Sequence, residues 1–177
     1  LHSRALAETG GAVWAVDGAP ARGDGLRCKA ASAQLRSIDT VVSWAVSLPL
    51  VDSCADVVVS NYCFHHLRDA DKHRALSEAH RVLRPGGQLI VGDMMFSLGV
   101  LPPRDRRVLT DKVKAMVRKG PAGVHRLLKN GARVASGRWE QPAPARWWRE
   151  ALPLAGFVDV TVEELVHEGG LATARRP

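Results

Sequence analysis

The sequence is poor in cysteine and has no long apolar run. Its three cysteines, Cys28, Cys54 and Cys63, are odd in number and show no CxxC spacing, which argues against a disulfide framework and against a zinc site. No apolar run reaches the roughly 18–20 residues that a membrane helix needs, and the start carries no apolar signal segment. These absences predict reduced thiols, a cytoplasmic location and no membrane partner.

Sequence motifs of nucleic-acid-binding proteins are also lacking, since there is no aromatic-rich RNA motif and no zinc-finger spacing. The 177 residues nevertheless carry a net charge of +7. The excess lies in residues 104–150, which hold thirteen Lys and Arg against four Asp and Glu. Such a segment suits anionic partners, although a solvated helical face is the more common explanation. The sequence therefore argues against a nucleic-acid partner.

The clearest pattern that is present is one complete βαβ crossover over residues 56–92. The β-branched run 57–59 predicts a strand buried on both faces of a parallel sheet. Asp69 is expected to cap a helix over 70–83, and Leu76, Ala79 and Leu83 have the spacing to pack it on the sheet. The RPGG motif at 84–87 then stops the helix, and a second strand follows at 88–92.

The remaining segments continue the alternation of strands and helices. The chain holds 177 residues, enough for one domain with a sizeable core. Strands are expected at 12–16 and 38–42, helices at 19–35, 105–119, 122–134 and 145–155, and a closing antiparallel hairpin at 157–166 and 171–175 with its turn at 168–170. A helix end is expected at 1–11. This order predicts an α/β fold with a doubly wound, mostly parallel sheet that ends in an antiparallel hairpin.

Six motifs follow one another along the chain, namely VWAVD at 13–17, SLPL at 47–50, DVVVSN at 56–61, FHHL at 64–67, RVLRPGGQLIV at 81–91 and WWREALPLAGFVDVTVEEL at 147–165. Together they resemble the class I S-adenosylmethionine-dependent methyltransferases. The resemblance implies a Rossmann-like single domain over residues 1–177, with residues 101–145 as a helical lid or insertion before the last two strands. It also implies S-adenosylmethionine as the cofactor and methyl transfer to a small-molecule acceptor.

The same resemblance assigns the cofactor-binding residues. Asp17, followed by Gly18, stands where the family has the acidic residue that binds the ribose hydroxyls, and a carboxylate accepts hydrogen bonds from such a diol. Trp44, followed by Ala45, stands where the family usually has a carboxylate for the adenine amino group. Trp44 cannot accept that N–H, so it either stacks on adenine or packs in the fold. Asn61 is expected to contact the cofactor or the backbone.

The family's first strand and its glycine-rich loop are missing from the pattern. No GxGxG loop precedes Asp17, and only 39 positions separate Asp17 from Asp56. That interval has room for one helix–strand pair, whereas two would be required if the Asp17 strand came first. We expect either an N-terminally incomplete domain, whose second and fourth strands lack their shared neighbour, or another segment that fills this gap. In the isolated chain, cofactor binding is expected to be weak or lost. The residues upstream of Leu1 would test this expectation.

Candidate chemistry centres on the loop after the strand at 57–59. His65 and His66 are the best-placed bases for an acceptor that must lose a proton, although the family often has such residues there for packing. Asp93 either meets the substrate or caps the next segment. His73 and His80 share a helix but lie two turns apart, too far for one metal ion, so we expect no metal site.

The leading interpretation is an S-adenosylmethionine-dependent methyltransferase. One alternative is a degenerate, non-catalytic member of the family that serves as a binding or interaction module. A nicotinamide-dependent Rossmann enzyme and a nucleic-acid-modifying enzyme rank lower, the first because the SLPL and RVLRPGG motifs and the closing hairpin disfavour it. The sequence does not determine the acceptor, the methylated atom, the oligomeric state or the pathway.

Overall fold

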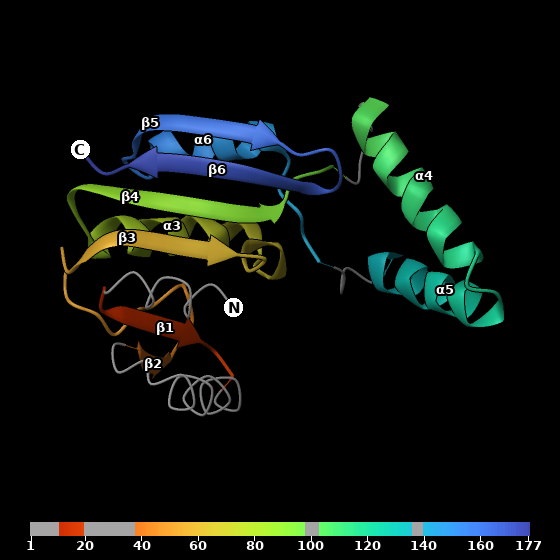
Figure 1. Ribbon diagram of the computed structural model, residues 1–177, viewed down its shortest axis with the longest axis horizontal. Coiled ribbons are helices and arrows are strands. Elements are labelled where there is room, and N and C mark those ends of the chain that lie inside the picture. The colour runs from red at the N-terminus through yellow and green to blue at the C-terminus, as the bar shows by residue number, and fades with distance from the viewer. Residues whose placement is uncertain (1–10, 20–37, 98–102, 136–139) are drawn as a thin grey trace. The chain divides into compact units, whose positions relative to one another are not determined.

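The computed structural model describes residues 11–19, 38–97, 103–135 and 140–177. The chain divides into two compact units, residues 1–52 and residues 53–177. Figure 1 labels the helices and strands of both units. The helix predicted at 19–35 and the helix end predicted at 1–11 fall almost entirely outside the described residues.

The first unit contains a pair of parallel strands. β1 (Val13–Asp17) and β2 (Ile38–Val42) pair in register from Val13 opposite Ile38 to Asp17 opposite Val42. Both strands were predicted, and β2 has the predicted bounds. Because the two strands are parallel, their carboxyl ends, Asp17 and Val42, lie at the same edge of the pair.

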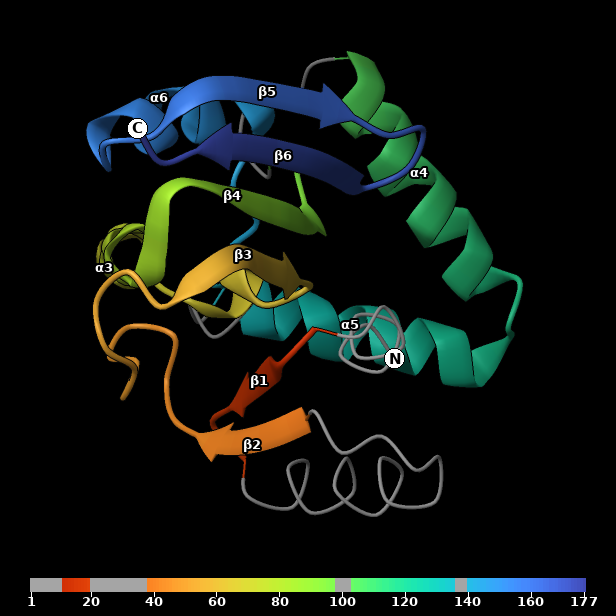
Figure 2. The same cartoon turned by 60° about the vertical axis from the view of Figure 1, so that its left-hand side comes forward.

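The second unit is built on a four-stranded sheet in the order β3-β4-β6-β5. β3 (Ala55–Asn61) and β4 (Leu83–Met94) are parallel, whereas β6 (Gly169–Arg175) runs antiparallel to both β4 and β5 (Val158–Glu164). α3 (Asp69–Val82) and α6 (Ala145–Leu154) lie on one face of this sheet, as Figures 1 and 2 show. The predicted Rossmann-like α/β fold, with parallel crossovers and a closing antiparallel hairpin, is confirmed.

The core of the second unit lies between this sheet and the two helices. Alternate residues of β4 and β6 are buried, namely Leu89, Val91, Ala172 and Ala174. α3 packs on β4, and α6 packs on β5 and β6. Leu76, Ala79 and Leu83, which the helical spacing selected, are each at most 5% exposed, so the predicted packing stripe of this crossover is confirmed.

The prediction that the β3 strand is buried on both faces is wrong. Val57 and Val59 are 47% and 38% exposed. In register they stand beside Gln88 and Ile90, on the face opposite the buried Leu89 and the helices. β3 is also an edge strand among the described strands of this sheet. The β-branched run therefore predicts the strand correctly but not the burial of its two faces.

The start of α3 also differs from the prediction. Arg68 is the N-cap residue and makes no side-chain capping bond, while Asp69 is already the first helical residue. The Asp69 carboxylate instead accepts a hydrogen bond from the buried Lys72 ammonium, with 2.7 Å between Oδ1 and Nζ. Asp69 is therefore an acidic residue of the first turn, where its negative charge interacts favourably with the positive end of the helix dipole.

Glycines shape the turn between α3 and the main part of β4. Gly86 has φ of +80°, a conformation that glycine adopts without strain. A Cβ on Gly87 would lie 2.8 Å from the Arg84 carbonyl oxygen and 3.0 Å from that of Asp56. The ladder with β3 passes from Leu83 directly to Gln88, so the predicted turn at 84–87 forms a bulge within β4.

The closing hairpin pairs as predicted but starts its second strand earlier. β6 begins at Gly169, so the two glycines assigned to the turn belong to the strand, opposite Met94 and Asp93. A Cβ on Gly170 would collide with the side chain of Met95. The glycines are therefore required by close packing within the strand, which a sequence pattern does not distinguish from a turn.

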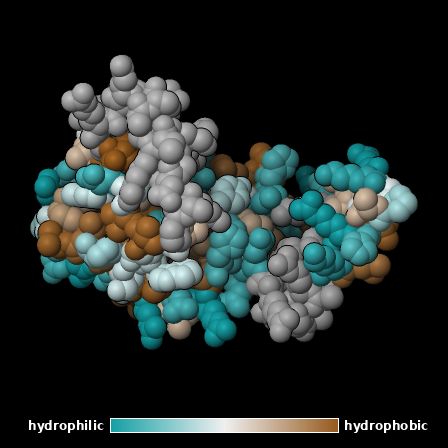
Figure 3. Space-filling view, turned by 90° about the horizontal axis from the view of Figure 1, so that it is seen from below, coloured by the Kyte–Doolittle hydropathy of each residue, from teal (hydrophilic) through white to brown (hydrophobic). Residues whose placement is uncertain are grey.

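Two further helices, α4 (Pro103–Val117) and α5 (Pro121–Ala135), were both predicted and contact each other. Gly120, with φ of +69°, separates them. Within the described residues, none of the helices combines the length and apolarity needed to cross a membrane. Apolar side chains do reach the surface, as Figure 3 shows; the most exposed include Val166 (88%), Leu154 (81%) and Val51 (75%).

Candidate functional site

In the first unit, the expected cofactor residues gather where β1 and β2 end. Asp17 is the last residue of β1, and its Oδ1 accepts a hydrogen bond from the Ala19 backbone N–H at 2.8 Å. The Ser43 backbone N–H donates to the Asp17 carbonyl oxygen at 3.2 Å. This bond holds the segment that follows β2 beside Asp17.

The side chain of Trp44 lies over Gly18. A Cβ on Gly18 would lie 3.2 Å from the Cε3 atom of Trp44, so a larger residue would displace the indole ring. The Trp44 side chain remains 69% exposed, which is unusual for an indole that serves as core packing. Asp17, Gly18, Trp44 and Ala45 thus form one cluster at the carboxyl ends of two parallel strands, where α/β sheets bind ligands.

In the second unit, the loop after β3 is held by a buried carboxylate. Asp93 is 1% exposed and lies near the end of β4. Its Oδ2 accepts the backbone N–H groups of Cys63 at 3.0 Å and Phe64 at 2.7 Å, and its Oδ1 accepts the N–H of Met94 at 2.6 Å. Oδ1 also lies 2.6 Å from Nδ1 of His65. Asp93 therefore fixes both the loop and the imidazole.

Local structure explains how His65 reaches Asp93. Tyr62 turns the chain after β3 with φ of +50°, and its N–H donates to the Gly92 carbonyl oxygen at 2.8 Å. The next residues form a short 3₁₀ helix, η1 (Phe64–His66). Phe64 packs edge-on against the buried Trp148 of α6, with ring centroids 5.1 Å apart. These contacts place the His65 ring in a buried position, 5% exposed.

His66 and Glu140 lie next to His65. The ring centroids of His65 and His66 are 4.0 Å apart, and His66 is exposed. The Gln141 backbone N–H donates to the His65 carbonyl oxygen at 2.6 Å, which brings the segment before α6 alongside η1. Sequence reasoning missed Glu140, because it stands 74 positions after His66 and no spacing pattern joins the two.

Asn61 and Asp93 are the other two residues that the sequence singles out. Asn61 is the last residue of β3 and pairs with Gly92, where a Cβ would lie 2.9 Å from the Asn61 Oδ1. For Asp93, the sequence allows either contact with the substrate or capping of the next segment. In the structure, its carboxylate accepts hydrogen bonds that join the end of β4 to the loop after β3. The sequence signal for Asp93 was its place after a buried strand, and nothing in the spacing identified His65 as its partner.

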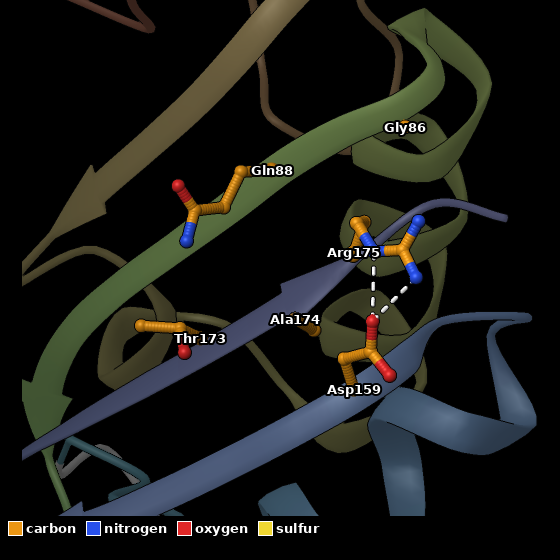
Figure 4. A pocket seen from close by; sticks show the side chains of 6 residues that line it. All are labelled: Gly86, Gln88, Asp159, Thr173, Ala174 and Arg175. Carbon is orange, nitrogen blue, oxygen red and sulfur yellow. Dashed lines mark hydrogen bonds and ion pairs between the residues drawn. The ribbon is translucent and has the colours of Figure 1, made fainter.

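A shallow hollow elsewhere on the sheet of the second unit contains none of these residues. Its lining includes Gln88, Thr173 and an ion pair in which Arg175 Nε donates to Asp159 Oδ2 at 2.7 Å, as Figure 4 shows. Gln88 stands opposite Arg175 in the ladder, near the start of β4, whereas Asp93 stands near its end. The hollow therefore lies apart from the loop after β3 that holds His65.

Comparison with known proteins decides the family. Residues 1–91 match the family model described as a methyltransferase domain. The chain belongs to this methyltransferase family. The match includes β1, β2 and β3, α3 and most of β4, so it contains every expected cofactor residue and both candidate histidines.

Individual proteins are also similar to this chain. The "Uncharacterized protein YafE" of Escherichia coli is 47% identical over 62 residues, which are 35% of this chain and 29% of that protein. Among solved structures, the PH0226 protein of Pyrococcus horikoshii is similar with a TM-score of 0.70, 15% identity and coverage of 99% of this chain and 76% of that one. A SAM-dependent methyltransferase of Aquifex aeolicus gives 0.61 and 17%, over 93% and 69%.

These comparisons either cover only part of the relative's length or show the fold alone. The matched stretch is less than a third of the length of the Escherichia coli relative, and the structural likenesses at 15–17% identity concern the fold alone. The fold and family are those of S-adenosylmethionine-dependent methyltransferases, whose cofactor is S-adenosylmethionine. The activity of the protein and its acceptor are proposals.

Proposed function

We propose that this protein transfers a methyl group from S-adenosylmethionine to a small-molecule acceptor. The observation that carries the proposal is the cluster of Asp17, Gly18 and Trp44 at the carboxyl ends of β1 and β2, in a chain of the methyltransferase family. A carboxylate beside an exposed indole suits the two parts of adenosine, since the carboxylate accepts the ribose hydroxyls and the indole stacks on the base.

Trp44 replaces the family's usual carboxylate, so we propose a different mode of adenine recognition. An indole offers a flat apolar surface but no acceptor for the adenine amino group. Its exposure of 69% leaves that surface available to a ligand. Stacking on an aromatic side chain contributes about 1–3 kcal/mol per base in nucleic-acid complexes, enough to replace one polar contact.

We further propose that His65 accepts the proton of the acceptor. Bound S-adenosylmethionine would supply a methyl group on a sulfonium sulfur. The acceptor's oxygen or nitrogen would gain the methyl carbon, and the electron pair of the carbon–sulfur bond would stay on the sulfur as S-adenosylhomocysteine. The acceptor's proton passes to Nε2 of His65, because Nδ1 faces the carboxylate of Asp93 at 2.6 Å. Asp93 then stabilises the imidazolium that forms, which is the arrangement of a base with an orienting carboxylate.

A non-catalytic, degenerate family member is the alternative, and the replacement of the family's usual carboxylate by Trp44 favours it. A small-molecule acceptor, a helical lid at residues 101–145 and the cytoplasmic location stay predictions. So does the absence of nucleic-acid partners.

A methyl-transfer assay separates the two functions. The protein is incubated with methyl-labelled S-adenosylmethionine and a panel of small alcohols, phenols, carboxylates and amines. Transfer that the H65Q substitution slows by about 10²–10⁴-fold supports the base. Binding of the cofactor without transfer to any class of acceptor supports the non-catalytic module.

A further inference from the structure

We propose that His65, His66 and Glu140 form a binding site for a divalent transition-metal ion, with Zn²⁺ as the best-suited ion. One potential ligand atom of each side chain lies within 4.8 Å of the other two. The three residues come from two segments, η1 and the stretch before α6, which the hydrogen bond from Gln141 N–H to the His65 carbonyl oxygen joins at 2.6 Å.

The distances between these three ligand atoms are close to the distances between the ligand atoms of a bound metal ion. In a tetrahedral zinc site with bonds of about 2.0–2.1 Å, the ligand atoms stand roughly 3.3–3.5 Å apart. Closing from 4.8 Å requires movements of about an ångström. His66 is exposed and Glu140 is half-buried, so their side chains can make this movement by rotation while His65 stays in place.

His65 already has the orientation of a metal ligand. Metal-bound histidines almost always donate their second ring N–H to a carboxylate or carbonyl group, which fixes the tautomer and the ring. Asp93 accepts from Nδ1 of His65 at 2.6 Å, and both residues are at most 5% exposed. Nε2 is then the ring nitrogen that carries a lone pair for the metal.

The chemistry of the ligands selects the class of ion. Two imidazole nitrogens and one carboxylate oxygen suit Zn²⁺, Co²⁺ and Ni²⁺, whereas Mg²⁺ and Ca²⁺ prefer oxygen ligands alone. Three protein ligands leave a fourth tetrahedral position for water or another ligand. The sequence did not predict this site because it requires Glu140, which has no sequence relation to the histidine pair.

Metal binding has a consequence that rests on the proposed function. The Nε2 atom that would bind the metal is the atom proposed to accept the acceptor's proton, and one lone pair cannot do both. Bound Zn²⁺ therefore inhibits methyl transfer by occupying the atom that would accept the acceptor's proton. Binding itself is independent of cofactor and acceptor, so it is measured separately from activity.

The test is a calorimetric titration of the chelator-treated protein with ZnCl₂ and, separately, with MgCl₂. We expect one Zn²⁺ per chain with micromolar or tighter affinity, and no binding of Mg²⁺. The H66Q and E140Q substitutions should each weaken Zn²⁺ binding by at least about tenfold. H125Q, which removes an exposed histidine of α5 outside the cluster, and C63S, which removes a nearby thiol, should leave the affinity unchanged.

Several results would overturn the proposal. They are wild-type binding weaker than about 100 μM, equal affinity in H66Q and E140Q, or loss of the site in C63S, which would reveal a thiolate ligand instead. Thermal unfolding of each variant without metal shows whether it is folded. Where transfer activity is measurable, the inhibition constant of Zn²⁺ should rise in E140Q by the same factor as the dissociation constant. If the protein binds Zn²⁺ as expected but shows no transfer, the metal site stands and the proposed function fails.

Discussion

Nδ1 of His65 and Oδ1 of Asp93 are 2.6 Å apart in a buried pair, which joins the loop after β3 to the end of β4. An ionised carboxylate only accepts hydrogen bonds, so the proton between the two atoms lies on Nδ1. The pair therefore fixes which nitrogen faces an incoming group. This relationship underlies both the proposed base and the proposed metal site.

The tautomer of His65 gives the first prediction. In ¹⁵N NMR spectra, the neutral form of His65 should be the tautomer that carries its proton on Nδ1. In D93N the amide can orient either its oxygen or its nitrogen toward the ring, so a mixture of tautomers is expected. H66Q serves as the matched control, since His66 is exposed. A wild-type spectrum dominated by the Nε2-protonated form would contradict the assignment.

Trp44 distinguishes adenine stacking from packing. Because the side chain is 69% exposed, W44A should change the free energy of unfolding by no more than about 0.5 kcal/mol, as for other surface substitutions. Cofactor affinity should fall roughly five- to hundredfold, which corresponds to the 1–3 kcal/mol of one stacked base. Urea denaturation and calorimetry measure the two effects. A large loss of stability with unchanged affinity would show that Trp44 is a packing residue.

Trp148 supports the loop that carries His65. Its side chain is fully buried and packs edge-on against Phe64 and Trp147, with centroids 5.1 and 5.0 Å away. W148A should lower the free energy of unfolding by about 3–5 kcal/mol, the usual cost of removing a buried tryptophan. W147A, at a partly exposed position of the same helix, should cost clearly less. Equal losses in the two variants would mean that Trp148 does not anchor η1.

The pH dependence of stability has a contribution from His80. Burial lowers the pKa of His80 below its ordinary value, the positive charge of Arg176 lowers it further, and the Gly156 backbone acts in the opposite direction. Arg176 Nη1 also donates to the His80 carbonyl oxygen at 3.0 Å. The unfolded state therefore binds a proton more readily than the folded state.

The expected result follows from that sign. The contribution of neutral His80 is complete above the unfolded pKa of about 6.5 and is lost as the pH falls through the lower folded pKa. Between pH 7 and pH 5, the wild type should lose more stability than H80Q in urea titrations at each pH. H125Q provides the control for an exposed histidine. Parallel pH curves for the wild type and H80Q would disprove this contribution.

Sequence reasoning found the elements of the fold more readily than their surroundings. Strand and helix periods located β2, α3, α4 and α5 because these segments carry regular apolar spacing and clear breakers such as Gly86 and Gly120. The burial of Val57 and Val59 was predicted wrongly, since burial depends on what covers a strand. The role of Gly170 was also misread, because its need for close packing against Met95 comes from a residue 75 positions away.

The sequence predicts only part of the candidate site, because the rest depends on tertiary contacts. Asp17, Trp44 and His65 follow strand ends, which a sequence shows. The pairing of His65 with Asp93 and the approach of Glu140 depend on tertiary contacts between η1, β4 and the segment before α6.

A titration with S-adenosylhomocysteine, comparing D17N with D39N, tests the central claim most directly. Asp39 is an exposed carboxylate at the second position of β2, so D39N removes the same charge away from the carboxyl end of the strand. Calorimetry at up to millimolar ligand should detect binding, as the proposed function requires, and not the loss of binding that the sequence alone left open. D17N should reduce the affinity at least about tenfold, the value of a charged hydrogen bond, while D39N leaves it unchanged. No binding at millimolar ligand, or equal binding by D17N, would contradict the account.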